Sequence, residues 1–407
     1  MEAAKNSMTM PLILHDLHDS QMFAIAQAAG RAGIPVDGTF WPMEGWGEKS
    51  RYVQSSVELP CLGEQLKGTY ALSLKNTGFT GVWLPCVDDM ADFTARYQEM
   101  LRNIGFRFIT ADADTIASAF ATESFPQTTI LKTAPMQNIL AGDLYGTVDK
   151  QNFPLLLKTV RDHFEKFEDA QSLRNFLGRE KEKYGLNHYH RVQQFIEGGV
   201  EKMASAILLF DEESRPVRGF TGRRLRVVET AFGPFGETTA AKAEWIPELY
   251  EGARELLSAL HWKGFAEVEC KQGEDGIWYV MEINPRLSGW TPLAEADGAG
   301  LISAYYQMCA DGVKLEEACL QRSKADYVRI IATSYHDPDW AVGRAGNKTL
   351  WQQIGSLLST IKYYRKRRPD LVLGAWDDLD LSASLAIFQS TIKRFWKKRR
   401  LMRKGNA

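Results

Sequence analysis

The sequence feature that most constrains this chain is a predicted β-hairpin that carries several acidic side chains. It consists of GFAEVECKQ over residues 264–272, a turn GEDG, and IWYVMEINP over residues 277–285. Side chains on a strand alternate between its two faces, so that Glu267 and Glu269 share one face. Ionised groups are rarely buried unless something pairs with them. The hairpin must therefore be exposed on that face or hold a cation there.

The pairing of the two strands decides which acids meet. If Gln272 pairs with Ile277 across the turn, Glu267 lies opposite Glu282, and Glu269 lies on the same face. A slip of one residue would turn the acids of one strand away from those of the other. The predicted register therefore gathers three carboxylates on one face.

Oxygen donors grouped in this way predict a magnesium site. Asn284 adds a carboxamide two residues beyond Glu282, and like charges repel one another unless a cation lies among them. Such hard donors suit a Mg²⁺ ion that also holds phosphate oxygens. Arg286, just beyond the strand-ending Pro285, could bridge phosphate or acyl-phosphate oxygens. The alternative is a solvated antiparallel face on which Arg286 neutralises the acids.

The rest of the chain predicts an α/β region followed by an α+β region. Residues 1–112 alternate apolar runs such as MPLILHD and FRFIT with helical patterns such as MADFTARYQEMLRNIG, which is typical of a doubly wound domain. The turn HDLHDSQ has no GxGxxG, so we expect a scaffold or substrate-side domain rather than a dinucleotide site. From Thr128 onward, the strands FPLLLK and HRVQQFIEG and a hairpin over residues 202–229 indicate α+β structure.

These patterns resemble the ATP-grasp superfamily of carboxylate:amine ligases, whose last core strands typically end in Glu-x-Asn-Pro-Arg. The similarity is strongest over FTGRRLRVVE and over the hairpin with its EINPR. Within the superfamily, the chain resembles the predicted carboligases that include D-aspartate ligase. The resemblance implies four parts: a pre-ATP-grasp domain over residues 1–112, a small nucleotide-binding subdomain over 113–198, a catalytic subdomain over 199–320, and a helical basic extension over 321–407.

The resemblance also implies roles for individual residues. It implies that Mg²⁺ is bound by Glu269, Glu282 and Asn284, and that Arg286 is the cation beside the transferring phosphate. Lys158, which ends FPLLLK, is implied to reach the nucleotide phosphates. The segment VQQFIEGGVE resembles an adenine hinge. The resemblance implies that the adenine lies beside Gln194, Phe195 and Ile196. It also implies that Glu201 accepts hydrogen bonds from the ribose hydroxyls.

A basic cluster and two departures complete the comparison with that superfamily. The cluster Arg223, Arg224 and Arg226 could hold an anionic substrate or the phosphoryl group, a role that we assign to Arg226, or it could be an exposed basic strand. The segment DADTIASAFATESFPQT has no lysine before its P-x-T. The segment TVRDHFEK, where a phosphate-covering flap is expected, has no glycine; Lys166 or His163 could act in its place.

Composition and the C-terminal segment predict the surroundings. Five cysteines without CxxC spacing, and no apolar run of about 18 residues, predict a cytoplasmic protein without disulfides or a membrane span. Two amphipathic stretches, 347–368 and 381–400, each end in a basic block. These blocks could complement helix dipoles, contact an anionic membrane surface at its inner face, or join copies in a homo-oligomer. Nucleic acid is not expected, because the chain shows no reader motif.

The sequence thus predicts an ATP-dependent ligase that needs Mg²⁺ and joins a small-molecule carboxylate to an amine through an acyl phosphate, with an amino acid as the expected substrate. The mechanism needs no side-chain nucleophile, since positioning and electrostatics carry it. The alternative is a nucleotide-binding scaffold or regulator without turnover, which the missing lysine and the glycine-free flap would favour.

Overall fold

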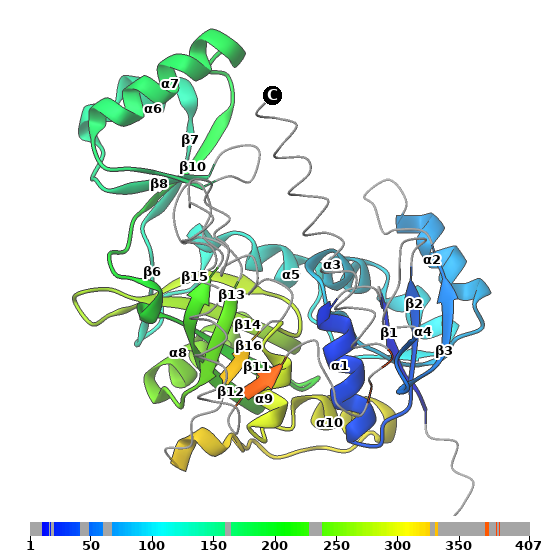
Figure 1. Ribbon diagram of the computed structural model, residues 1–407. Coiled ribbons are helices and arrows are strands. Elements are labelled where there is room, and N and C mark those ends of the chain that lie inside the picture. The colour runs from blue at the N-terminus through cyan, green and yellow to red at the C-terminus, as the bar shows by residue number, and fades with distance from the viewer. Residues whose placement is uncertain are drawn as a thin grey trace, which may run out of the picture.

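The structure is a computed structural model with three sheets (Figure 1). It describes residues 10–15, 17, 20–40, 49–59, 67–158, 164–227, 238–325, 330–332, 371–373, 380 and 382. The predicted combination of α/β and α+β regions is confirmed. The exact domain boundaries stay predictions.

The first sheet is wholly parallel, with the strand order β3-β2-β1-β4-β5 of a doubly wound domain. Its strands are β1 (Leu12–Leu14), β2 (Val36–Phe40), β3 (Val53–Glu58), β4 (Gly81–Trp83) and β5 (Phe106–Arg107). Its helices are α1 (Ser20–Arg31), α2 (Lys67–Asn76), α3 (Asp88–Arg96), α4 (Gln98–Ile104) and α5 (Ala113–Ala119). The helix predicted from MADFTARYQEMLRNIG is two helices, because Tyr97 leaves helical geometry between α3 and α4.

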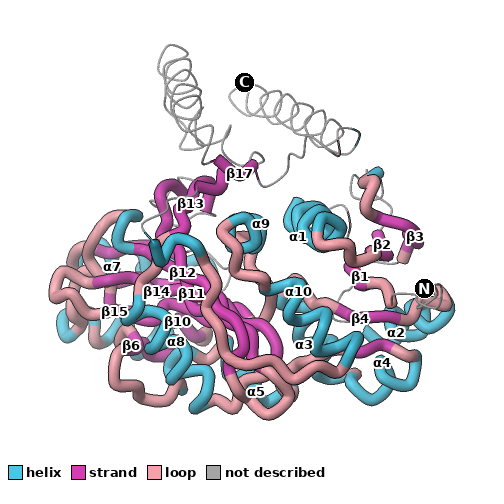
Figure 2. Tube along the Cα trace, turned by 90° about the horizontal axis from the view of Figure 1, so that it is seen from below, coloured by secondary structure: helices cyan, strands magenta, loops and turns pink. Residues whose placement is uncertain are grey.

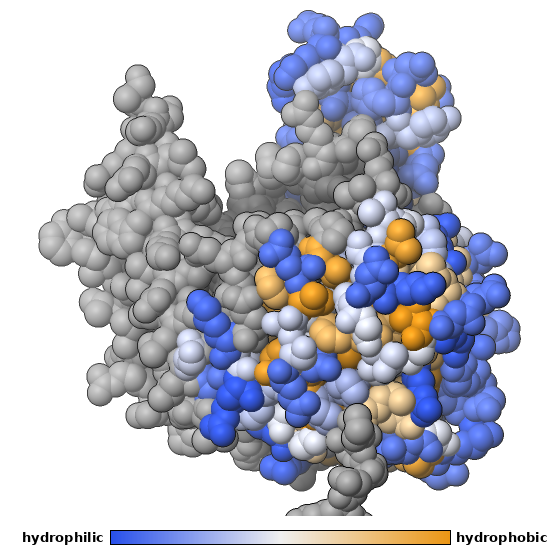
Figure 3. Space-filling model, turned by 90° about the vertical axis from the view of Figure 1, so that its right-hand side faces the viewer, coloured by the Kyte–Doolittle hydropathy of each residue, from blue (hydrophilic) through white to orange (hydrophobic). Residues whose placement is uncertain are grey.

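The second sheet is antiparallel and has its own hydrophobic core. Its order is β7-β10-β8-β9, and its elements are β7 (Met136–Leu140), α6 (Ala141–Gly146), β8 (Leu155–Lys158), β9 (Phe164–Phe167), α7 (Ala170–Tyr184) and β10 (Tyr189–Gln194). Leu144, Leu157, Leu173, Leu177 and Val192 are among its core residues. This small lobe rises above the rest of the molecule, and its visible surface is largely hydrophilic (Figure 3).

The third sheet has the order β17-β16-β13-β12-β11-β14-β15-β6 among the described residues. Its strands are β6 (Leu131–Thr133), β11 (Met203–Phe210), β12 (Pro216–Val227), β13 (Thr238–Ala243), β14 (Gly264–Gln272), β15 (Trp278–Asn284), β16 (Ile330–Ala332) and β17 (Leu371–Leu373). Its helices are α8 (Pro247–Ala259), α9 (Thr291–Ala296) and α10 (Leu301–Tyr306), the last continuing into a π-helical turn over Gln307–Asp311.

One continuous core joins the first and third sheets. Helices α9 and α10 lie between α1 and the large sheet (Figure 2), and Leu14, Ile25, Ile207, Phe220 and Tyr305 belong to the same buried cluster. Burial of apolar area is the main favourable term in such packing. The first and third sheets therefore form one body, from which the small lobe projects.

The C-terminal part of the chain returns to this body. β17 pairs with β16 in parallel, and Asp380 accepts hydrogen bonds from Ser50 Oγ and, at 3.1 Å, from the Arg51 amide. Nearly all of the two stretches 347–368 and 381–400 lies outside the described residues, so their helices and basic blocks stay predictions. Among the described residues, no helix is both long enough and apolar enough to cross a membrane.

Candidate functional site between the small lobe and the large sheet

The β14–β15 hairpin begins in a register that differs from the predicted one. Gln272 pairs with Trp278 and not with Ile277, a slip of one residue. The turn is closed by the Gly273 amide, which donates to the Ile277 carbonyl at 2.9 Å. Continued without interruption, this register would have separated the acids of the two strands.

A β-bulge offsets the slip. Met281 is an extra residue on β15, so Glu269 pairs with Glu282 and Glu267 pairs with Asn284. A bulge of this kind sets two residues of one strand against one of its partner and re-aims the side chains that follow. The predicted pairing was therefore wrong, yet the four predicted polar side chains still share a face.

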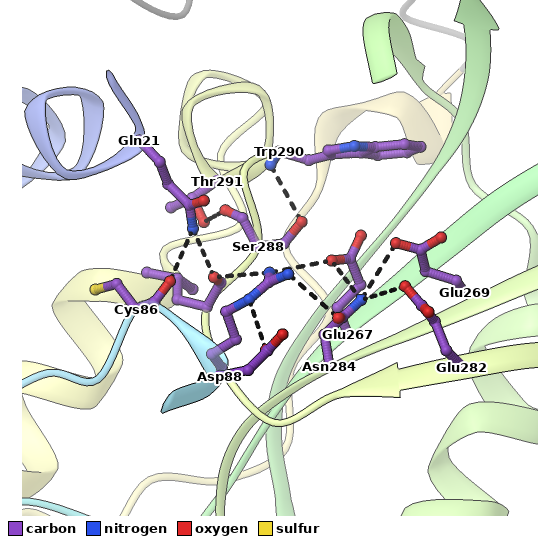
Figure 4. Close-up of polar contacts among 12 residues, drawn as sticks. Gln21, Cys86, Asp88, Glu267, Glu269, Glu282, Asn284, Ser288, Trp290 and Thr291 are labelled. Carbon is purple, nitrogen blue, oxygen red and sulfur yellow. Dashed lines mark hydrogen bonds and ion pairs between the residues drawn. The ribbon is translucent and has the colours of Figure 1, made fainter. Parts of the chain in front are cut away.

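These four side chains converge on one point (Figure 4). Nδ2 of Asn284 lies 3.4 Å from Glu267 Oε2, 3.2 Å from Glu269 Oε1 and 3.4 Å from Glu282 Oε1. The amide nitrogen carries only two hydrogens and cannot donate well to three carboxylates at once. The cluster is thus short of positive charge at its centre.

The pKa values of two of these acids show the same shortage. The charge of Glu269, then desolvation, then the charge of Glu267 together raise the pKa of Glu282 to about 7, although Glu282 itself is exposed. Burial, followed by the charge of Glu269, raises the pKa of Glu267, whose side chain is 3% exposed. The surroundings disfavour the ionised form of each carboxyl group, and a divalent cation bound nearby would favour it.

Two arginines partly compensate the acids. Arg224 on β12 forms an ion pair with Glu269. Arg286 lies 3.5 Å from Glu267 through Nη1, and its Nη2 donates to Asn284 Oδ1 at 3.2 Å. Burial alone would lower the pKa of Arg286, but the charge of Asp88, followed by those of the glutamates, outweighs burial and raises it.

Arg226, which the sequence analysis assigned to substrate, lies one step along β12. Arg224 pairs with Ala241 of β13, and Arg226 pairs with the next residue, Ala240, so that Leu225 is left as a bulge. Arg226 is half-buried, and its role stays a prediction. Arg224, from the same cluster, forms the ion pair with Glu269.

The first sheet supplies one wall of the site. Asp88, in the first turn of α3, lies 3.0 Å from Arg286 Nε, and Gln21 of α1 donates to the Leu287 carbonyl at 2.8 Å (Figure 4). Helix α1 follows β1 and helix α3 follows β4, and the strand order reverses between these two strands. In doubly wound sheets, ligands bind at this switch point. The acidic cluster therefore faces the ligand-binding edge of the first sheet.

The same face of β14 reaches the predicted hinge. Lys271 lies two residues beyond Glu269 on an uninterrupted strand, so their side chains share a face. Lys271 Nζ is 4.7 Å from the centroid of the Phe195 ring, and Nζ of Lys166, from β9, is 3.9 Å from it. Burial lowers the pKa of Lys271, with Glu197 acting against it and Lys166 with it.

The remaining hinge residues connect the small lobe to β11. Gln194 ends β10, and its Nε2 donates to the Pro154 carbonyl at 2.9 Å, while Ile196 is buried. Glu201 follows in a short 3-10 turn, where its carbonyl accepts from Arg223 at 3.0 Å. These residues belong to the segment VQQFIEGGVE, which runs from β10 toward β11. Their contacts with a nucleotide stay predictions.

Two predicted phosphate contacts fall at the border of the described residues. Lys158 is the last residue of β8 and pairs with Arg191 and Phe164 through the backbone. His163, with most of the segment TVRDHFEK, lies outside the described residues. Lys166, the other substitute proposed for the flap, lies at the hinge.

Comparison with known proteins supports the architecture. No protein-family model matches the sequence, and no curated protein matches it at a significant level. Solved structures do match in fold. The N5-carboxyaminoimidazole synthetase of Staphylococcus aureus complexed with ADP has a TM-score of 0.60 and 11% identity, covering 89% of this chain and 98% of that one. The L-amino acid ligase of Bacillus licheniformis has a TM-score of 0.55 and 20% identity, covering 74% of each chain.

A third match is the biotin carboxylase domain of the 2-oxoglutarate carboxylase of Hydrogenobacter thermophilus, a complex with ADP, magnesium and bicarbonate. Its TM-score is 0.54 at 15% identity, covering 77% of this chain and 72% of that one. The chain has the ATP-grasp fold. The fold that the resemblance implied is thereby confirmed.

Three side chains of the site were not assigned roles from sequence. Once the register is known, strand alternation places Arg224 and Lys271 on the face of Glu269. Lys271 is two residues from Glu269 on β14. Arg224 is two residues from Gly222, which pairs with Ser205, and Ser205 pairs with Glu269. Asp88 comes from another sheet, and no local pattern places it beside Arg286.

Proposed function

We propose that this protein is an ATP-dependent ligase that joins a carboxylate to an amine through an acyl phosphate. The observation that carries the proposal is the acidic cluster of Glu267, Glu269 and Glu282, which groups hard oxygen donors on one face of the hairpin and in which the pKa values of Glu267 and Glu282 are raised. Hard donors with surplus negative charge fit Mg²⁺. Bound there, the ion would offset charge on the transferring phosphoryl group.

The donor set fits such an ion. Glu269 and Glu282 face each other across the hairpin, and their oxygens both lie near the Asn284 amide. Turning that amide over would bring its oxygen to the same place, because the two ends of a carboxamide are nearly equal in size, in exchange for the bond that the oxygen accepts from Arg286. We therefore assign the metal to Glu269, Glu282 and Asn284, with Glu267 as a nearby charge.

ATP fits along the face of β14. From Glu267 to Lys271 is four residues, a span of about 13 Å at about 3.3 Å per residue. Lys271 and Lys166, beside Phe195, offer positive charge at the hinge end. Lys158 is the last residue of β8, in the small lobe. We assign the adenine to the segment Gln194–Ile196 and the ribose to Glu201.

Arg286 connects the nucleotide site to the substrate side. Its guanidinium contacts Asn284 and Glu267 on one side and Asp88 on the other. A substrate carboxylate held between Arg286 and the switch point of the first sheet would lie next to the phosphoryl group. Holding the two reactants close together would be the main source of catalysis. The carboxylate would attack the γ-phosphorus with ADP as the leaving group, and the amine would then attack the acyl carbon, lose a proton and release phosphate. The L-amino acid ligase match supports an amino acid as substrate.

Release of ADP by the full-length protein tests this function. The protein is given Mg-ATP with a panel of amino acids, singly and in pairs. ADP that appears only with a carboxylate and an amine together, with an amide product, supports the ligase. Nucleotide binding without turnover across the panel would support the alternative, a scaffold or regulator. Membrane contact and homo-oligomer formation stay separate predictions.

A further inference from the structure

A second cluster of side chains that could bind a metal lies in the small lobe, away from the acidic cluster. Glu180 of α7 and His190 of β10 approach to 2.7 Å between Oε2 and Nε2. Nε2 of His188 lies 3.3 Å from the same Glu180 oxygen and 3.2 Å from Nε2 of His190. Among the described residues, this is the group of histidine, cysteine and acidic side chains whose ligand atoms converge within metal-binding distance.

The local fold builds this cluster from eleven residues. Helix α7 ends at Tyr184, and the φ of 73° at Gly185 lets the chain turn back toward β10. His188 lies just before β10 and His190 within it, and the short distance between their Nε2 atoms places both rings on one side. Glu180 lies in the last turns of α7, which packs over that side (Figure 1).

Hydrogen bonding alone serves the three atoms poorly. A neutral imidazole carries one hydrogen, on either Nε2 or Nδ1. If both Nε2 atoms carry hydrogens toward Glu180, the two N–H groups face each other at 3.2 Å. If only His190 carries one, it must be shared between Glu180 and His188. A cation at the centre would instead accept a lone pair from all three.

The separations match those around a tetrahedral metal. Zn²⁺ bonds histidine nitrogen and carboxylate oxygen at about 2.0 to 2.1 Å, which sets neighbouring ligand atoms about 3.3 Å apart. Two of the three separations are 3.2 Å and 3.3 Å, and the third must widen from 2.7 Å. We propose that Glu180, His188 and His190 form a binding site for a divalent transition-metal ion of the Zn²⁺ type.

Burial and access suit such a site. His190 is fully buried beside Phe176, whose ring centroid is 6.3 Å from that of His190, whereas the side chains of His188 and Glu180 are 21% and 16% exposed. An ion can therefore enter from the His188 side. Two histidines and one carboxylate leave a fourth position for water. This site is distinct from the proposed magnesium site, since its residues lie on α7 and at the start of β10, whereas the proposed magnesium ligands lie on β14 and β15.

The bound ion is expected to cross-link α7 to the start of β10. It would stabilise the small lobe by binding the native state and not the unfolded chain. The proposal does not depend on the ligase function, because no residue of the cluster contacts the acidic cluster or the hinge in any described interaction.

Cobalt and zinc titrations of the full-length protein test the site. We expect metal-free protein to bind one equivalent of Co²⁺ with the visible absorption of a tetrahedral ion, to lose this absorption to Zn²⁺, and to melt at a higher temperature with Zn²⁺. His188→Ala and Glu180→Gln each remove a ligand at a partly exposed position. Both should weaken Co²⁺ binding by about tenfold or more and cancel the Zn²⁺ shift.

His261→Asn is the matched control. His261 is exposed on the large subdomain and has a φ of 51°, which asparagine tolerates, so this variant should bind Co²⁺ as the parent does. A thiolate charge-transfer band would place the ion on cysteine and overturn the proposal. So would Co²⁺ binding of equal strength in His188→Ala, Glu180→Gln and the parent, or no binding in the parent.

Discussion

The two ends of the β14 face make opposite demands on a ligand. At one end, four carboxylates, Glu267, Glu269, Glu282 and Asp88, meet two guanidinium groups. At the other end, Lys271 is buried close to Lys166, and both lie near the Phe195 ring. Burial penalises unbalanced charge of either sign. Mg-ATP would relieve both, because its ion would lie at the acidic end while the phosphates nearest the ribose would carry negative charge toward the lysines.

The largest effect should come from Glu282→Gln at the acidic end. The change removes one charge at nearly constant volume, so turnover should fall by roughly 100-fold or more as the metal loses a ligand. Melts with and without Mg-ATP check this: the parent should gain stability and the variant much less. Without metal, the variant should melt no lower than the parent, since like-charge repulsion is relieved. Equal Mg-ATP shifts in both would mean that this is a solvated sheet face.

The cationic end should respond more weakly. Lys271→Met removes a buried charge near Lys166 while keeping a long side chain, so the ligand-free protein should be as stable as the parent or more so. ATP affinity should fall about tenfold, or about 1.4 kcal/mol. Isothermal titration measures it, with the exposed Lys314→Met as control. Unchanged affinity would remove Lys271 from the nucleotide site.

A smaller effect is expected where the first sheet meets the acidic end. Asp88→Asn removes the ion pair with Arg286 but keeps the shape of the side chain. The KM for the carboxylate substrate should change a few-fold, while the KM for ATP stays the same. Asp92→Asn, on the same helix and paired with Arg96, is the control. A change confined to the KM for ATP would contradict the assignment of Asp88 to the substrate side.

The smallest effect concerns pH. The folded-state pKa of Glu282 is raised from 4.5 to about 7, so the folded protein holds this proton more tightly than the unfolded chain. The stability that this contributes is complete below the unfolded pKa and is lost as the pH rises through about 7. Measured in chelator, the melting temperature of the parent relative to Glu282→Gln should therefore fall from about pH 5 to about pH 8. Parallel curves would show that Glu282 titrates normally.

The sequence predicted elements better than it predicted contacts. The hairpin, the strands FPLLLK and HRVQQFIEG and the order of α and β regions carry strong apolar patterns, and they form as expected. β3, VQSSVE, was not recognised, because it is a mostly exposed edge strand without an apolar run. Bulges decided two further points: the extra Met281 restored the acidic face, and Leu225 set Arg224 and Arg226 apart. Neither bulge leaves a local signal.

The return of the chain to the large sheet has a practical consequence for truncation. Parallel pairing with β17 covers the backbone hydrogen-bonding groups of β16, and uncovered edge strands invite pairing between molecules. A variant cut at residue 369, chosen to remove the basic segment, would also remove β17 and the Asp380 contacts with Ser50 and Arg51. Self-association of that variant would then report an uncapped edge rather than a lost membrane or oligomer contact. Ending the chain after Ser382 keeps β17 and Asp380, so the second basic block can be removed without uncovering β16.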